Sequence, residues 1–138
     1  MIEASVAITV PFYDVDSMEI AWHGNYAKYL EIARCELLDK IGYNYLQMRE
    51  SGYIWPIIDM RIRYIKATRF GQKVCVNAKL TEWENRLKID YLITDKETGE
   101  RLTKAHTIQV AVALSTGEMC FVSPTVLTNK LSHLEEKG

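Results

Sequence analysis

The chain has 138 residues, of which 48% are hydrophobic and 25% charged, so we expect one globular domain spanning 1–138 and not a disordered or fibrous chain. Its formal net charge of −1 argues against a nucleic-acid-binding protein, which normally carries a basic excess. The longest apolar run, 110–114, is far shorter than the roughly 20 residues that span a membrane. The three cysteines lack CxxC spacing and no leader-like segment is visible, which favours a cytoplasmic protein without a zinc site.

The first third of the chain predicts one strand and two helices. Apolar residues alternate from Val6 to Phe12, which indicates a strand with one buried face. From Asn25 the apolar spacing changes to three and four residues, and Gly42 follows where a helix cap is expected, so a helix of about 17 residues is predicted. A shorter helix is expected at 45–50.

The remainder predicts a meander of strands. Period-2 alternation indicates strands at 58–64, 74–80 and 87–93, and the polar segment 95–100 reads as a hairpin loop. A long strand is expected to follow at 102–114, and a last short strand at 119–122. The polar tail, about 127–138, is expected as a terminal helix or a frayed end. Strand, long helix and meander indicate an α+β domain, and the exposed edges of such long strands favour a homodimer.

The segment that joins the first strand to the long helix is not explained by core formation. It carries Asp14, Asp16, His23 and Asn25 just before the helix N-terminus, where unpaired N–H groups can stabilise a negative oxygen. The same residue types are also common in ordinary loops, and Asn25 or His23 could simply cap the helix. The spacing fits neither a calcium loop nor a serine-hydrolase elbow at Ser17.

These residues resemble the hotdog-fold acyl-CoA thioesterases of the 4-hydroxybenzoyl-CoA thioesterase type. The family pattern has an Asp-x-Asp pair, a hydrophobic pair, an aromatic-His-x-Asn-Tyr run and a Glu-x-Ala-Arg run. The matching segments are Asp14-Val15-Asp16, Ile20-Ala21, Trp22-His23-Gly24-Asn25-Tyr26 and Glu31-Ile32-Ala33-Arg34. A looser match runs from Tyr64 to Gly71. The resemblance implies a hotdog fold, an antiparallel sheet wrapped around one long central helix, over nearly the whole chain.

The resemblance also implies an activity, namely hydrolysis of an acyl-CoA or acyl-carrier-protein thioester by a homodimer or homotetramer, with no metal or cofactor. Asp16 would act as nucleophile or general base, and the backbone N–H of His23 would polarise the carbonyl. Asn25 and Tyr26 would contact the substrate. The basic side chains of Lys66 and Arg69 would hold the phosphates of coenzyme A.

One departure from the family pattern leaves alternatives open. Glu19 stands where relatives usually carry glycine, so the loop is expected to take another course or to offer a second carboxylate. A hotdog dehydratase or isomerase, or a non-catalytic acyl-binding dimer, are the competing hypotheses. Structural roles are expected for Glu31 and Arg34 as a helix-face ion pair, and for Tyr26 and Tyr29 as core residues.

Overall fold

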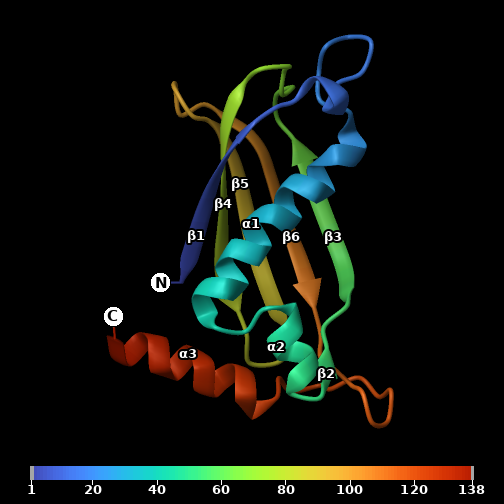
Figure 1. The fold of residues 1–138 in the computed structure, drawn as a ribbon, viewed down its shortest axis with the longest axis vertical. Helices are drawn as coiled ribbons and strands as arrows, with labels where there is room; N and C mark the ends of the chain where they lie inside the picture. Colours follow the sequence, from blue (N-terminus) through green and yellow to red (C-terminus); the bar gives the residue numbers. More distant parts are fainter. Residues whose placement is uncertain (1, 138) are drawn as a thin grey trace.

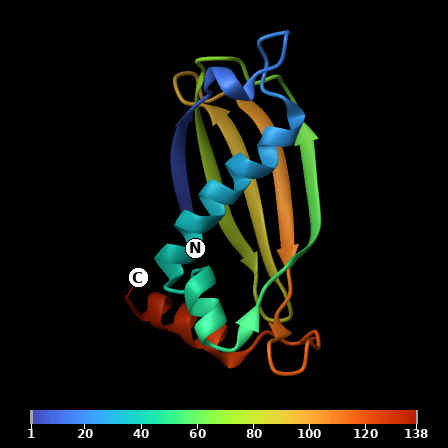
Figure 2. The same ribbon diagram turned by 45° about the vertical axis from the view of Figure 1, so that its right-hand side comes forward.

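A five-stranded antiparallel sheet and the long helix that crosses it dominate the computed structural model, which describes residues 2–137 (Figure 1). The strand order is β1-β4-β5-β6-β3. The strands are β1 (Glu3–Thr9), β3 (Ile57–Tyr64), β4 (Lys73–Glu82), β5 (Leu87–Asp95) and β6 (Arg101–Gln109). Helix α1 (Tyr26–Ile41) lies on one face of this sheet (Figure 2), which is the architecture that the sequence predicts.

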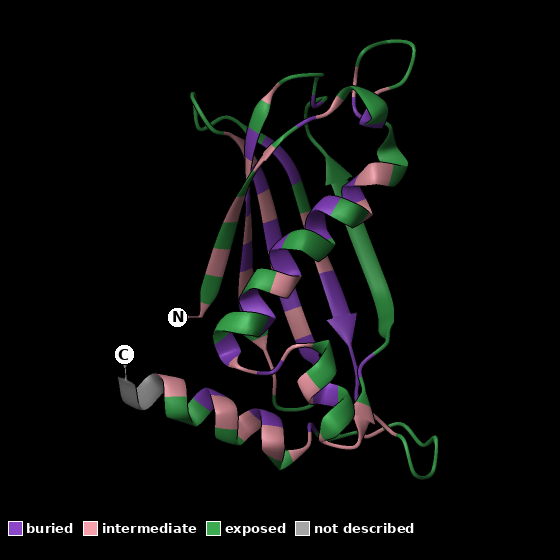
Figure 3. Ribbon diagram, in the orientation of Figure 1, coloured by how far each residue is buried: buried purple, intermediate pink, exposed green. Residues whose placement is uncertain are grey.

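The core lies between α1 and the inner face of the sheet. Alternate residues of β4 and β5 are buried and the residues between them are only half-buried, as period-2 alternation predicts (Figure 3). Leu30, Ala33 and Leu37 of α1 are completely buried against them. Full burial of each leucine contributes about 1.5–3 kcal/mol. Gly42, at φ 79°, ends the helix in the left-handed conformation that glycine favours, as predicted.

Two further helices close the lower end of the molecule in Figure 1. Helix α2 (Tyr45–Glu50) begins at a capping box in which Asn44 and Gln47 each bond the other's backbone N–H. Helix α3 (Thr125–Lys137) buries Leu127 and Leu131 in the core, so the tail is a terminal helix; Gly138 lies outside the described residues.

The long strand predicted at 102–114 is wrong. β6 ends at Gln109, and the chain then leaves the main sheet and forms β7 (Val112–Ala113), which pairs with β2 (Tyr53–Ile54) in a separate two-stranded sheet. The strand predicted at 119–122 is reduced to a single bridge between Met119 and Val112. The residues from 110 to 114 form an unbroken apolar run, which favours burial but does not specify which strand they pair with.

The ends and neighbours of two other strands also differ from the prediction. β1 stops at Thr9, and Phe12 lies in a short 3₁₀ turn, η1 (Phe12–Asp14), with 77% of its surface exposed. Pro11, which has no N–H to donate, lies between them. β3 pairs with β6 rather than with β4, so only β4-β5-β6 form a meander and β3 is an edge strand whose residues are nearly all exposed (Figure 3).

Candidate active site

The loop between β1 and α1 is held by backbone hydrogen bonds to the segment that follows β3 and by bonds within the loop. Ala21 donates its N–H to the carbonyl of Thr68 at 2.6 Å, and Phe70 donates to the carbonyl of Glu19 at 3.1 Å. Within the loop, Trp22 donates to the carbonyl of Asp14 at 2.9 Å. The loop is therefore fixed between the start of α1 and the segment that follows β3.

Asp14 anchors this loop to the helix. Its carboxylate is buried and accepts hydrogen bonds from Lys28 Nζ at 2.6 Å and from the Tyr29 hydroxyl at 2.7 Å. Its carbonyl accepts a further bond from Asn25 Nδ2 at 2.8 Å. Burial, together with the bond to and the negative charge of Asp14, raises the pKa of Tyr29 well above its ordinary value of 10.0. A buried carboxylate with these partners is compensated, so Asp14 has a structural role.

Asp16, two residues further on, has a contrasting environment. It is exposed, and its Oδ1 accepts one hydrogen bond, from the N–H of Met18 at 2.8 Å. Its Oδ2 accepts none from the residues that the structure describes. The backbone on either side is fixed, because Asp16 donates to the carbonyl of Ile20 and accepts from the N–H of Glu19, both at 3.0 Å. Asp16 thus presents a free carboxylate oxygen on a restrained turn.

Asp16 borders a pocket of about 350 Å³ at the N-terminal end of α1. Three segments meet there: the loop after β1, the first turn of α1, and the end of β3 with the residues that follow it. The lining residues are Asp16, Ile20, Ala21, His23, Tyr26, Tyr64, Ile65, Lys66 and Ala67. Four of the six predicted site residues are therefore brought together, while Asn25 and Arg69 do not line the pocket.

His23 begins a short 3₁₀ turn, η2 (His23–Asn25), that leads into α1. Its imidazole is exposed and lies against the Trp22 indole, with 5.0 Å between ring centroids. Neither the N–H of His23 nor that of Gly24 donates a hydrogen bond to another residue within 2–137. A Cβ on Gly24 would overlap the Trp22 indole, so glycine permits this close packing. Two free N–H groups at a helix start can bind a negative oxygen.

The other predicted site residues have definite structural partners. Asn25 does not cap α1 through its side chain, which instead donates to Asp14. Tyr26 is buried and packs edge-on against Tyr64, with 4.9 Å between ring centroids. Lys66 pairs with both carboxylate oxygens of Glu100, at 2.9 and 3.1 Å.

The remaining predictions concern Arg69, the two tyrosines of α1 and the ion pair of Arg34 with Glu31. The backbone of Arg69 is bridged to Ile20, and its side chain is exposed outside the pocket. Tyr26 and Tyr29 are core residues, as predicted. The predicted pairing of Arg34 with Glu31 is present at 4.0 Å, but Arg34 donates shorter hydrogen bonds to the hydroxyl oxygens of Tyr45, at 2.7 Å, and Tyr91, at 3.4 Å.

Glu19 adopts a φ of 62° and is the one non-glycine residue within 2–137 with a positive φ. The backbone therefore follows the course that a glycine would favour, and the expected change of course is not seen. Glu19 is also absent from the pocket lining, so it does not supply a second carboxylate there.

Sequence reasoning missed the partners that fix the site. Tyr64 lines the pocket and its hydroxyl donates to the carbonyl of His23 at 3.4 Å, across 41 positions of sequence. Lys28 looks like an ordinary solvent-facing helix residue, although it pairs with Asp14.

Within 2–137 no group of three or more His, Cys, Asp or Glu side chains is placed to hold a metal ion. None of the described helices is long and apolar enough to cross a membrane.

Comparison with known proteins gives consistent matches over most of the chain. A curated protein of Synechocystis sp., named as a candidate esterase, is 28% identical over 132 residues, which cover 95% of this chain and 80% of that protein. The crystal structure of a DHNA-CoA thioesterase from Staphylococcus aureus is 29% identical, with a TM-score of 0.79 over 88% of this chain and 81% of that one. A 1,4-dihydroxy-2-naphthoyl-CoA thioesterase structure from Synechocystis has a TM-score of 0.84 at 18% identity, covering 96% and 98%.

The fold and the pocket at the helix start define a hotdog-fold protein of the thioesterase class, which confirms the predicted fold. The family model described as Thioesterase-like superfamily matches residues 10–130, and the chain belongs to this superfamily.

Proposed function

We propose that the protein hydrolyses an acyl-CoA thioester to the free acid and the thiol. The observation that carries this proposal is that Asp16 and His23 line one pocket, where Asp16 has a carboxylate oxygen and His23 a backbone N–H without a partner within 2–137. A thioester needs little more, because its thiolate is a good leaving group. The Staphylococcus aureus neighbour is named for an acyl-CoA substrate, which favours coenzyme A over a carrier protein.

The reaction follows from these two groups. With the thioester carbonyl at the helix start, Asp16 takes a proton from water as the water oxygen attacks the carbonyl carbon. The N–H of His23 stabilises the negative oxygen that develops. Collapse of this intermediate breaks the carbon–sulfur bond, and the departing thiolate takes up the proton. A direct attack by Asp16, through a mixed anhydride that water then hydrolyses, uses the same geometry.

The experiment measures free thiol released from a panel of acyl-CoA and acyl-carrier-protein thioesters. Wild-type protein should release thiol, Asp16→Asn should not, and the matched loop variant Glu19→Gln should behave like wild type. The panel includes crotonyl and 3-hydroxyacyl thioesters. A change in ultraviolet absorbance without thiol release would identify a dehydratase, and binding without either signal would identify an acyl-binding module.

We further infer a homodimer formed through β3. The two edges of the sheet differ, because β1 exposes no large apolar side chain, whereas β3 exposes several beside its charged residues. The apolar side chains of β3 include Ile57, Ile58 and Met60, which are 40–53% exposed. An apolar edge strand with unpaired backbone groups favours pairing with another strand.

The dimer can be tested by light scattering after chromatography. Met60→Glu should give a monomer, because it would bury a charge in the β3 interface. Met119→Glu is the matched control, since Met119 is 50% exposed and its backbone bridges Val112 of β7 and no residue of β3. A monomeric wild type, or a dimer unaffected by Met60→Glu, would contradict the β3 interface.

A further inference from the structure

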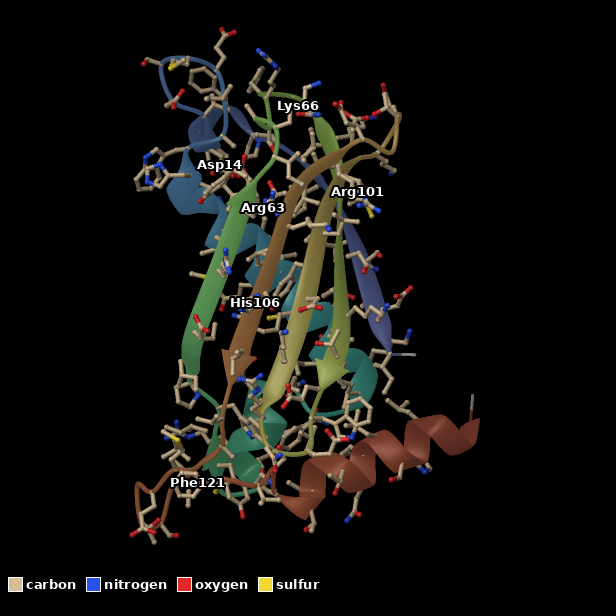
Figure 4. All side chains as sticks on the ribbon, turned by 180° about the vertical axis from the view of Figure 1, so that it is seen from behind. Asp14, Arg63, Lys66, Arg101, His106 and Phe121 are labelled. Atoms are coloured by element: carbon tan, nitrogen blue, oxygen red, sulfur yellow. The ribbon has the colours of Figure 1, made fainter. Side chains whose placement is uncertain are left out.

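The face of the sheet that α1 leaves open carries a basic hollow of about 610 Å³ (Figure 4). Six basic residues and two acidic residues line it, although the chain as a whole has a net charge of −1. The basic residues are Arg61, Arg63, Lys79, Lys88, Arg101 and Lys104, and the acidic residues are Glu3 and Asp90. Such a concentration of positive charge on one face attracts anions.

Across the strands of this face, oppositely charged residues are neighbours in one row, or level, of the register, and like charges are neighbours in the next row. At the first level the strand register places Lys79 opposite both Glu3 and Asp90, so the signs alternate. At the next level Arg63 lies directly opposite Lys104, a pairing of like charges that is destabilising in a sheet. Beyond Lys104 on that level comes the apolar Leu92, so no carboxylate offsets the pair.

Arg101, at the start of β6, adds a third cation near this end of the hollow (Figure 4). None of the three side chains, Arg63, Arg101 and Lys104, makes a hydrogen bond or ion pair to any residue within 2–137. We call these three residues the cation triad. Its members are exposed, uncompensated and free to bind an anion.

The cation triad lies close to the candidate active site along the chain. Arg63 is next to Tyr64, which lines the catalytic pocket from the other face of β3. Lys66, in the lining of that pocket, pairs with Glu100, the neighbour of Arg101. The Lys66–Glu100 pair therefore links a residue of the pocket to the chain neighbour of a residue of the hollow. A ligand with its thioester in the pocket and a flexible arm past Lys66 would carry its far end to the triad.

We propose that the cation triad, with Leu92 beside it, binds the phosphate-bearing nucleotide end of the thioester substrate. The proposal rests on the proposed function and assigns its carrier as coenzyme A. The nucleotide end of coenzyme A combines several phosphate charges with an aromatic base, which matches three cations beside an apolar side chain. The hollow is within the usual range for small-ligand sites, about 300–1,000 Å³.

The test compares two variants that remove the same charge from the same face. Arg63→Gln/Lys104→Gln disrupts the triad, whereas Lys79→Gln/Lys88→Gln removes two lysines outside it. The substrates are an acyl-CoA and the matching S-acyl-N-acetylcysteamine, which has the same thioester but no phosphate. We expect the triad variant to lose roughly tenfold or more of the preference in kcat/KM for acyl-CoA, through KM, and the control variant to keep that preference.

Calorimetric titration with adenosine 3′,5′-bisphosphate tests the site without catalysis. Wild type and the control variant should bind it and the triad variant should bind at least roughly tenfold more weakly. Equal binding by both variants, with an unchanged KM for acyl-CoA, would overturn the proposal. A triad variant that slows only acyl-carrier-protein hydrolysis would overturn it in favour of protein docking. If neither thioester is hydrolysed, the proposed function fails, while the titration still decides whether the triad binds phosphate.

Discussion

The loop that precedes α1 contains two carboxylates in opposite environments. Its anchor, around Asp14, is buried, and both oxygens of that carboxylate are bonded, to Lys28 and to Tyr29. Its tip, from Asp16 to Ile20, is mostly exposed, and one oxygen of Asp16 is free. A single residue, Val15, thus separates a group that holds the loop from a group that is available for chemistry.

This difference shows how burial and hydrogen bonding give one carboxylate a structural role and leave the other available for a chemical role. A buried carboxylate needs its full set of partners and cannot also serve a substrate without leaving its cation and hydroxyl unpaired. An exposed carboxylate can react, but on a loose chain it would be poorly positioned. The anchor restrains the start of the loop, since Asp14 also accepts bonds from Asn25 and Trp22 through its carbonyl. Backbone hydrogen bonds of Asp16 with Ile20 and Glu19 restrain the turn at the tip.

The largest expected effect is on activity, from Asp16→Asn. Thiol release from acyl-CoA should fall by about 10²–10⁴-fold, the range for loss of a general base or acid. The free energy of unfolding should stay within about 0.5 kcal/mol of wild type, because Asp16 is exposed and makes one side-chain bond. Steady-state kinetics and urea unfolding measure the two quantities. Near wild-type turnover by the folded variant would remove Asp16 from the mechanism.

Asp14→Asn should have its main effect on stability, in contrast to Asp16→Asn, which should mainly reduce activity. The variant leaves Lys28 without its anionic partner and weakens the bond to Tyr29, so we expect a destabilisation of about 2–3 kcal/mol. Thermal unfolding should shift downward by roughly 5–10 °C. Asp16→Asn is the matched control, being the same substitution two positions away. Equal melting temperatures for the two variants would show that Asp14 is not an anchor.

Alkaline pH tests the anchor through Tyr29. Because its pKa is raised in the folded state, its contribution to stability is fully present below the unfolded value of 10.0 and is lost as pH rises above it. The free energy of unfolding of wild type should therefore decline above about pH 10, by up to about 1.4 kcal/mol per pH unit from this group.

Tyr29→Phe removes that titration, so its stability should decline less steeply above about pH 10 than that of wild type. It should also cost about 1 kcal/mol at neutral pH through the lost hydrogen bond. Tyr13→Phe is the control, since Tyr13 is 83% exposed. The decisive measurement is urea unfolding at several pH values between 8 and 11, and parallel curves for Tyr29→Phe and wild type would contradict the assignment.

Sequence predicts those elements of this fold whose determinants are local. The residues of α1 repeat every three to four positions and end at Gly42, and the structure places the helix over the predicted range. The errors lie where pairing is non-local. Nothing in the apolar run that begins at Val110 shows that the chain leaves one sheet for another, and nothing in β3 shows that its partner is β6.

The same limit applies to the site. The motif brings Asp16 and His23 to one pocket, because both lie in a single short loop before the helix. The ion pair of Lys66 with Glu100 joins positions 34 apart, so the motif gives no sign that this lysine is already neutralised. Its predicted contact with phosphate has to compete with that carboxylate. The uncompensated cations of the outer face become visible only from the strand register.

The smallest expected effect concerns the backbone at the tip. Glu19 has a φ of 62°, a conformation that costs a residue with a Cβ about 1–2 kcal/mol. Glu19→Gly removes this strain but increases the freedom of the unfolded chain, so a net stabilisation of about 0.5–1 kcal/mol is expected. Ser17→Gly, in the same loop but at a negative φ, should instead destabilise. If urea unfolding shows both glycine variants to be destabilised alike, the left-handed conformation of Glu19 is not strained.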